Sequence, residues 1–81
     1  MSEASSQKIL VLLKKKLETS NVEVLDESDQ HVGHAGSGHY AVFLSSPFFE
    51  GRSLIEKHRL VYDALEEMKD EIHALRIKIL Q

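Results

Sequence analysis

The chain has 81 residues and a formal net charge of −3 with its histidines neutral, and 42% of its residues are hydrophobic. This length predicts one domain with a small core, which leaves no room for an enclosed substrate cavity together with a catalytic apparatus. The acidic balance lacks the basic excess of a dedicated nucleic-acid binder. The absence of cysteine excludes disulfides and metal sites built from thiolates alone.

The first expected element is a helix that begins near Ser5 or Ser6, since either residue can cap it. Residues 1–4 are then expected to be disordered. Apolar side chains recur at helical spacing in the next segment, at Ile9, Leu12, Leu13 and Leu17. Turn-forming residues at 19–21 predict the end of this helix.

Residues 22–26 and 39–44 are rich in apolar and β-favouring side chains, and each segment predicts a strand. The residues between them, 27–38, are polar and glycine-rich, which predicts a loop. A simple hairpin needs only about two to five residues, so a loop of this length inside a compact domain is expected to be functional or mobile.

Ser53 and Glu56 have the spacing of a capping box and predict the start of a second helical region. Apolar residues and one histidine hold helical phase from there for about four turns: Leu54, Ile55, His58, Val61, Tyr62, Leu65 and Met68. The alternative is a break near His58 that gives a short helix followed by a long one.

Residues 72–80 alternate between apolar and polar side chains, which predicts a final half-buried strand that His73 opens. The element order is therefore α-β-β-α(α)-β. A right-handed crossover through the second helical region makes strands two and three parallel, while strands one and two are antiparallel. The expected fold is α+β, with helices on one face of a three-stranded mixed sheet.

No apolar run approaches the ~20 residues that span a bilayer. The N-terminal residues show neither a secretory signal nor the arginines of a transit peptide. We therefore expect a cytoplasmic protein, with an organelle as the alternative if a targeting segment has been removed.

Four stretches resemble the BolA family. Residues 26–31, DESDQH, resemble the family pattern D-E-S-x-x-H, and residues 38–40, GHY, resemble its H-[FY]. Residues 49–62, FEGRSLIEKHRLVY, resemble F-x-G-x-S-L-x-x-R-H-R-L-V-Y, with Lys57 where the family more often has arginine. Residues 72–75, IHAL, resemble its V/I-H-A-L.

The resemblance covers about residues 5–80 and implies one BolA-like domain over 1–81, with a class II KH-like fold. It also implies a monothiol glutaredoxin as partner and a shared [2Fe–2S] cluster, in iron–sulfur trafficking and iron homeostasis. The partner's cysteine and a glutathione thiolate hold one iron. His73 and His31 are the implied ligands of the other iron, and His34 is the alternative to His31.

The residues alone favour roles without metal binding. His31 is then a solvated loop histidine and His73 a strand-edge histidine. His39 is a structural residue or one that supports a metal ligand, and His58 is a buried core residue. Two imidazoles on one iron would resemble Rieske ligation and would make cluster binding pH-dependent. Because the chain has no cysteine, a partner must supply thiolates. The hypothesis requires the loop and the start of the final strand to meet at one sheet edge.

The rival function is nucleic-acid binding, with Arg52, Lys57 and Arg59 around a helix-turn-helix-like region and the lysines of residues 14–16 on the first helix. A solvated helix face is the simpler interpretation of these basic residues. Residues 33–36 also spell the GxxG of KH domains, but a KH clamp joins two helices and this segment joins two strands. We therefore interpret that match as chance. No nucleophile elbow, phosphate loop or metal-hydrolase motif is present, so an enzyme is not expected.

Arg76 and Lys78 fall on the polar side of the final strand. Together with Arg59 they can contact nucleic acid or dock an acidic or glutathione-bearing partner, although ordinary surface charge is the simpler interpretation. The chain is expected to be a monomer alone and a heterodimer with its partner.

Overall fold

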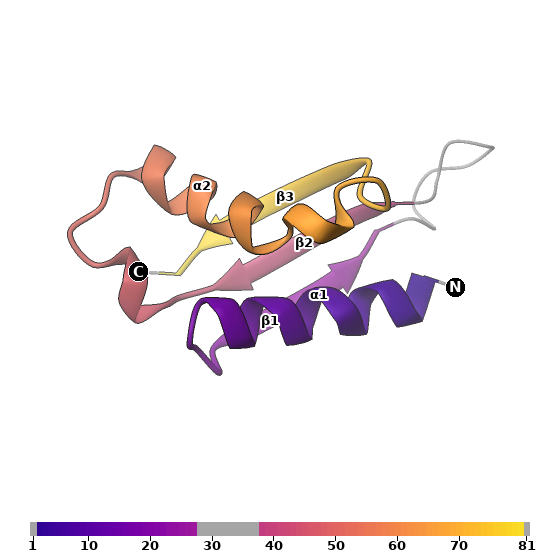
Figure 1. The fold of residues 1–81 in the computed structure, drawn as a ribbon, viewed down its shortest axis with the longest axis horizontal. Helices are drawn as coiled ribbons and strands as arrows, with labels where there is room; N and C mark the ends of the chain where they lie inside the picture. The colour runs from indigo at the N-terminus through magenta and orange to yellow at the C-terminus, as the bar shows by residue number, and fades with distance from the viewer. Residues whose placement is uncertain (1, 28–37, 81) are drawn as a thin grey trace.

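The computed structural model describes residues 2–27 and 38–80, which form two α-helices, three strands and two short 3-10 helices (Figure 1). The principal elements have the following bounds: α1 Ser2–Lys16, β1 Val22–Asp26, β2 His39–Leu44, α2 Leu54–Ala64 and β3 Ala74–Ile79. The 3-10 helices are η2 Pro47–Phe49 and η3 Glu66–Met68. The predicted order is confirmed, and the first two strands have the predicted bounds.

The strands form one mixed sheet in the order β1-β2-β3. β1 pairs antiparallel with β2, and β2 pairs parallel with β3, as the crossover rule predicts. Val42 of β2 has Val24 and Ile77 as its partners on the two sides, so one apolar row crosses the sheet. Both helices lie over the same face of the sheet (Figure 1).

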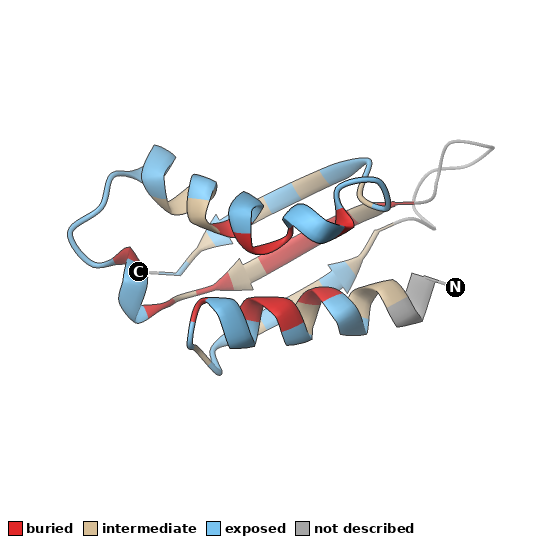
Figure 2. Ribbon diagram, in the orientation of Figure 1, coloured by how far each residue is buried: buried red, intermediate tan, exposed pale blue. Residues whose placement is uncertain are grey.

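The core lies between this helix layer and the sheet, where buried residues of both layers face one another (Figure 2). Its largest fully buried side chains are Phe49, Ile9, Leu13, Leu44, Met68, Val42 and Val61. Each of these side chains contributes about 1.5–3 kcal/mol by leaving water. The helical spacing of the apolar residues in α1 explains why one stripe of that helix is buried.

Two predictions about α1 and β3 are wrong at their boundaries. α1 begins at Ser2 rather than at Ser5 or Ser6, so part of the segment expected to be disordered belongs to the helix. β3 begins at Ala74, so His73 precedes the strand instead of opening it. The reason is a turn in which the N–H groups of His73 and Ala74 both donate to the Gly38 carbonyl.

α2 runs without a break past His58 and ends at Ala64, so the predicted alternative of two helices divided there is wrong. The capping box at its start is confirmed, because Ser53 and Glu56 exchange side-chain and backbone hydrogen bonds of 3.0 and 3.2 Å. His58 is half-buried rather than buried.

The apolar stripe predicted along α2 is buried only in part. Leu54, Ile55 and Tyr62 are 61%, 65% and 53% exposed, whereas Val61 is fully buried. Successive helical residues differ by about 100° in direction, so Tyr62 points away from the side on which Val61 packs. Nowhere in the described part of the chain is a helix both long enough and apolar enough to cross a membrane.

Candidate functional site

One end of the sheet gathers the end of β1 and the starts of β2 and β3. β2 and β3 are parallel and therefore start at the same end, and β1 is antiparallel and therefore finishes there. Glu27 and Gly38, which flank the 28–37 segment, lie at this end together with His73, because the Glu27 N–H donates to the His39 carbonyl and the His73 N–H to the Gly38 carbonyl. Shared metal ligation by His73 and a histidine of 28–37 requires this arrangement.

Gly38 makes the contact that brings His73 to this end of the sheet. Its carbonyl oxygen accepts hydrogen bonds from the N–H groups of His73 at 2.8 Å and Ala74 at 3.1 Å. Gly38 has φ +81°, and a Cβ there would lie 2.9 Å from the Glu71 carbonyl oxygen and 3.2 Å from Cδ2 of the His73 ring. Any side chain at residue 38 would therefore push against the histidine.

His73 is exposed, whereas His39 and His58 are half-buried. The His73 imidazole therefore has a solvent-facing position from which it can reach a metal carried by another protein. His31 and His34, the two candidate loop ligands, lie outside the described residues. Within 2–27 and 38–80 no group of three or more His, Cys, Asp or Glu side chains could hold a metal ion.

The turn before His73 is linked to the start of α1. Glu71 accepts a hydrogen bond of 3.4 Å from the Ser5 hydroxyl and lies 3.9 Å from the Lys8 ammonium. Both Lys8 and Glu71 side chains are about half exposed, so their ion pair contributes at most about 1 kcal/mol. The Gly38 hydrogen bonds, rather than this pair, fix the backbone of the turn.

Glu27 and Arg76 form an ion pair at the same end of the sheet. The Arg76 Nε and Nη2 atoms donate to the two carboxylate oxygens of Glu27 at 3.1 and 2.7 Å. These hydrogen bonds, and then the Glu27 charge, raise the pKa of the Arg76 guanidinium. The Glu27 N–H also donates to the His39 carbonyl at 2.7 Å, so pairing continues one residue past β1.

The small side chain of Ala41 leaves room for this ion pair to cross the sheet. Ala41 of β2 is the register partner of both Leu25 in β1 and Arg76 in β3, and it is 1% exposed. The Arg76 side chain extends over the middle strand toward Glu27, and a larger residue at 41 would obstruct it. The ion pair therefore ties the last described residue before 28–37 to β3.

The basic residues singled out in the sequence do not form one surface. Lys57 and Arg59 are two positions apart on α2, so their side chains point to different sides of the helix. The Arg52 Nε donates to the Phe48 carbonyl at 2.8 Å. Arg76 and Lys78 lie on the sheet face away from the helices, because they alternate with the β3 residues that pack on the core.

The region expected to resemble a helix-turn-helix contains one α-helix. α2 is preceded by η2, a 3-10 helix of three residues, whereas a helix-turn-helix needs two packed α-helices. The GxxG at 33–36 lies outside the described residues. The described residues of this region therefore lack the pair of α-helices that a helix-turn-helix DNA-binding motif requires.

Sequence reasoning missed Gly38 and the Glu27–Arg76 ion pair. The signal for Gly38 was its place directly before a strand, where a glycine often marks a close backbone approach. The signal for the ion pair was weaker, since its partners are 49 residues apart and meet only through the strand order.

The fold and the site define a small α+β domain with an exposed histidine, His73, beside Gly38, where the segment that connects β1 to β2 ends. This chain belongs to the BolA family, because the family model described as BolA-like protein matches residues 13–81. The description of this family model names no enzymatic activity. The resemblance seen in the sequence motifs and the predicted α+β fold are both confirmed.

Curated relatives support this assignment. The chain is 41% identical over 75 residues to SufE-like protein 1, chloroplastic/mitochondrial, of Arabidopsis thaliana, covering 80% of this chain and 20% of that protein. It is 42% identical over 73 residues to Protein BOLA1, chloroplastic, of the same plant, covering 80% of this chain and 46% of that protein. The chain thus spans less than half the length of these relatives.

Solved structures agree with the fold. The BolA domain of SufE1 from Arabidopsis thaliana is 40% identical with a TM-score of 0.82, covering 94% of this chain and 90% of that one. BolA1 from Arabidopsis thaliana is 36% identical with a TM-score of 0.79, covering 91% of this chain and 87% of that one.

Proposed function

We propose that this BolA-like domain binds a monothiol glutaredoxin and shares a [2Fe–2S] cluster with it. His73 and His31 are the proposed ligands from this chain, and His34 is the alternative to His31. The observation that carries the proposal is the Gly38–His73 contact, which holds an exposed imidazole beside the point where the 28–37 segment rejoins the sheet.

The donor chemistry of the chain fits a shared cluster better than a resident one. It has five histidines and no cysteine, so it can offer imidazoles but no thiolate. The partner's cysteine and glutathione supply the thiolates for the other iron. His73 binds through a neutral ring nitrogen, so its ligation competes with protonation.

The anchoring of the two ends of 28–37 also supports the proposal. Glu27 is held by Arg76 and by the His39 carbonyl, and Gly38 is held against His73. Both ends of the ligand-bearing segment are therefore fixed close to the start of β3. His39, half-buried at the start of β2, is proposed to support this end of the sheet rather than to bind iron.

The direct test mixes the domain with a cluster-loaded monothiol glutaredoxin and follows visible absorption and circular dichroism. The wild-type chain is expected to change the spectrum, and His73→Ala is expected to abolish that change. His58→Ala is the matched control, because His58 lies on α2 and leaves the site intact. His31→Ala and His34→Ala then assign the loop ligand. An unchanged response of His73→Ala would remove this residue from the site.

A second candidate function is DNA binding. A relative named DNA-binding transcriptional regulator BolA, from Escherichia coli strain K12, is 41% identical over 58 residues, covering 69% of this chain and 55% of that protein. The net charge of −3 and the dispersed basic residues speak against it. Titration of a labelled duplex at low and moderate salt tests it, and binding with a steep salt slope would favour it.

The location of the chain is proposed to be the cytoplasm, with an organelle as the alternative. The names of the Arabidopsis relatives, chloroplastic/mitochondrial and chloroplastic, favour the organelle. Imaging of a fluorescent fusion of the full-length protein in its own cells decides between the two compartments.

A further inference from the structure

β3 is the outer strand of the sheet, and among the described residues no strand pairs with its second edge. The N–H of Ala74 donates to the Gly38 carbonyl, and the N–H of Leu80 donates to the Leu44 carbonyl. The backbone N–H and C=O groups of the even-numbered residues of β3 therefore point toward β2. By the alternation of a strand, the N–H and C=O groups of Leu75, Ile77 and Ile79 face outward. This row of donors and acceptors can pair with an added strand.

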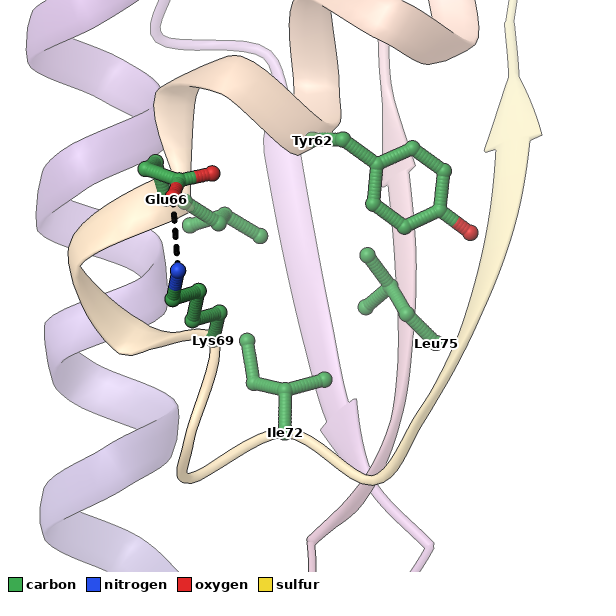
Figure 3. A pocket seen from close by; sticks show the side chains of 6 residues that line it. Tyr62, Glu66, Lys69, Ile72 and Leu75 are labelled. Atoms are coloured by element: carbon green, nitrogen blue, oxygen red, sulfur yellow. Dashed lines mark ion pairs between the residues drawn. The ribbon is translucent and has the colours of Figure 1, made fainter.

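On the helix side of this edge the surface is apolar and hollowed. A cavity of about 220 Å³ lies between the end of α2 and the start of β3. Tyr62, Ile72 and Leu75 extend into it from separate elements (Figure 3). Glu66 and Lys69 at its rim are paired at 3.3 Å, which leaves the hollow electrically neutral (Figure 3). An apolar side chain of an added strand fits this place.

On the other face of the sheet the same edge carries the cationic side chain of Lys78. Arg76 and Lys78 extend from β3 beside a shallow hollow of about 320 Å³ that Ala41 and Phe43 also line. Arg76 is engaged with Glu27, whereas Lys78 takes part in none of the ion pairs of the described residues. An added strand would place every second side chain on this face, where one of them lies next to Lys78.

Charge decides against a second copy of this chain as the occupant. Two β3 strands paired antiparallel about a twofold axis near Lys78 would bring the two Lys78 side chains beside one another. Like charges at opposing strand positions destabilise the pairing. A segment with acidic side chains on this face would instead place opposite charges beside Lys78, which stabilises strand pairing.

We propose that the free edge of β3 is a docking site for an extended acidic segment of a partner protein, which pairs with β3 as a fourth strand. Its side chains alternate: apolar residues lie over Leu75 and the hollow beside Tyr62, and carboxylates lie beside Lys78. The site uses residues on both sides of His73 but not its imidazole, so the proposal does not depend on cluster sharing.

The experiment uses the full chain and a fluorescein-labelled peptide of alternating valine and glutamate as probe. Fluorescence anisotropy measures binding, and amide hydrogen exchange by NMR locates it. At a probe concentration ten times the Kd, exchange at Leu75, Ile77 and Ile79 is expected to slow by about tenfold. Arg76 and Lys78, whose amides already bond to β2, are expected to change little. Binding without slower exchange at these three amides would overturn the proposal.

The contributions of the Lys78 charge and of the apolar hollow beside Tyr62 are tested with separate variants. Lys78→Glu is expected to weaken binding by about fivefold, whereas Lys15→Glu, the same charge change on the exposed side of α1, leaves it unchanged. Tyr62→Ala is expected to weaken binding also at high salt, because it removes an apolar wall. Equal losses for Lys78→Glu and Lys15→Glu, or equal binding of a valine–lysine peptide, would contradict the proposal.

The exchange experiment also identifies the other occupants. Protection of Leu75, Ile77 and Ile79 that grows with protein concentration in the absence of probe would show self-association and overturn the assignment to a partner. Protection by a DNA duplex but not by the acidic peptide would overturn it in favour of a nucleic acid. Protection by the acidic peptide alone supports it.

Discussion

The guanidinium of Arg76 on β3 donates two hydrogen bonds to the carboxylate of Glu27, the residue after β1, and so links the outer strands across the middle one. The Glu27 side chain is 16% exposed, whereas that of Arg76 is 71% exposed. The ion pair is thus anchored in the carboxylate and open to solvent on the arginine side. It fixes one end of the segment that carries His31 and His34.

Glu27→Gln and Arg76→Gln are expected to show positive coupling in a double-mutant cycle of urea unfolding, because each variant removes the same ion pair. The coupling is expected to fall as salt is added, since the arginine is exposed. The Glu66–Lys69 pair, with both side chains about two-thirds exposed, is the control and should couple less. Additive effects of the two glutamine variants would show that the pair does not stabilise the fold.

Gly38→Ala is expected to lower the free energy of unfolding by more than Gly51→Ala. Both glycines have positive φ, so alanine costs about 1–2 kcal/mol at either position. Only at Gly38 does the added Cβ meet neighbouring atoms, including the His73 ring, while Gly51 faces open space. Urea unfolding compares the two variants, and equal losses would contradict the close contact between Gly38 and His73.

Ser46→Ala is expected to destabilise the domain by about 1–3 kcal/mol, because it leaves a buried carbonyl without its donor. The Ser46 hydroxyl donates to the Leu17 carbonyl at 2.7 Å and accepts from the Phe48 N–H at 3.0 Å. Ser45→Ala removes a more exposed hydrogen bond to Asn21 and serves as the control. Thermal or urea unfolding compares the two variants. An equal loss of stability in both would argue against this link between the end of α1 and η2.

Cluster sharing with glutaredoxin is expected to weaken as the pH falls, because protonated imidazole cannot bind iron. The glutaredoxin's own cluster, held by thiolates, provides the reference in the same titration. Visible circular dichroism follows both species. A shared complex no more sensitive to acid than the reference would argue against histidine ligation.

Sequence reasoning predicted the fold well where local pattern decides it. The limits of residues 22–26 and 39–44 followed from β-favouring runs between turn formers, and the crossover rule supplied the strand directions. The stripe of α2 was overestimated because Ile55 and Tyr62 share helical phase with each other but lie on the flank of the buried side. Periodicity detects a common face without showing whether another element covers it.

The candidate site was less accessible to sequence reasoning. The meeting of His73 with the end of the loop follows from the strand order, and this much could be predicted. The hydrogen bonds of Gly38 and the Glu27–Arg76 ion pair depend on the register of β1, β2 and β3, which no local pattern encodes. The choice between His31 and His34 falls outside the described residues.

The most direct measurement is pulsed EPR of the reduced cluster in a complex of glutaredoxin with this domain labelled with ¹⁵N at its histidines. Two strongly coupled histidine nitrogens are predicted for the wild-type chain, and none for His73→Ala, which is expected not to share the cluster. A spectrum with no histidine nitrogen coupling in the wild-type complex would contradict ligation of the shared cluster by this domain.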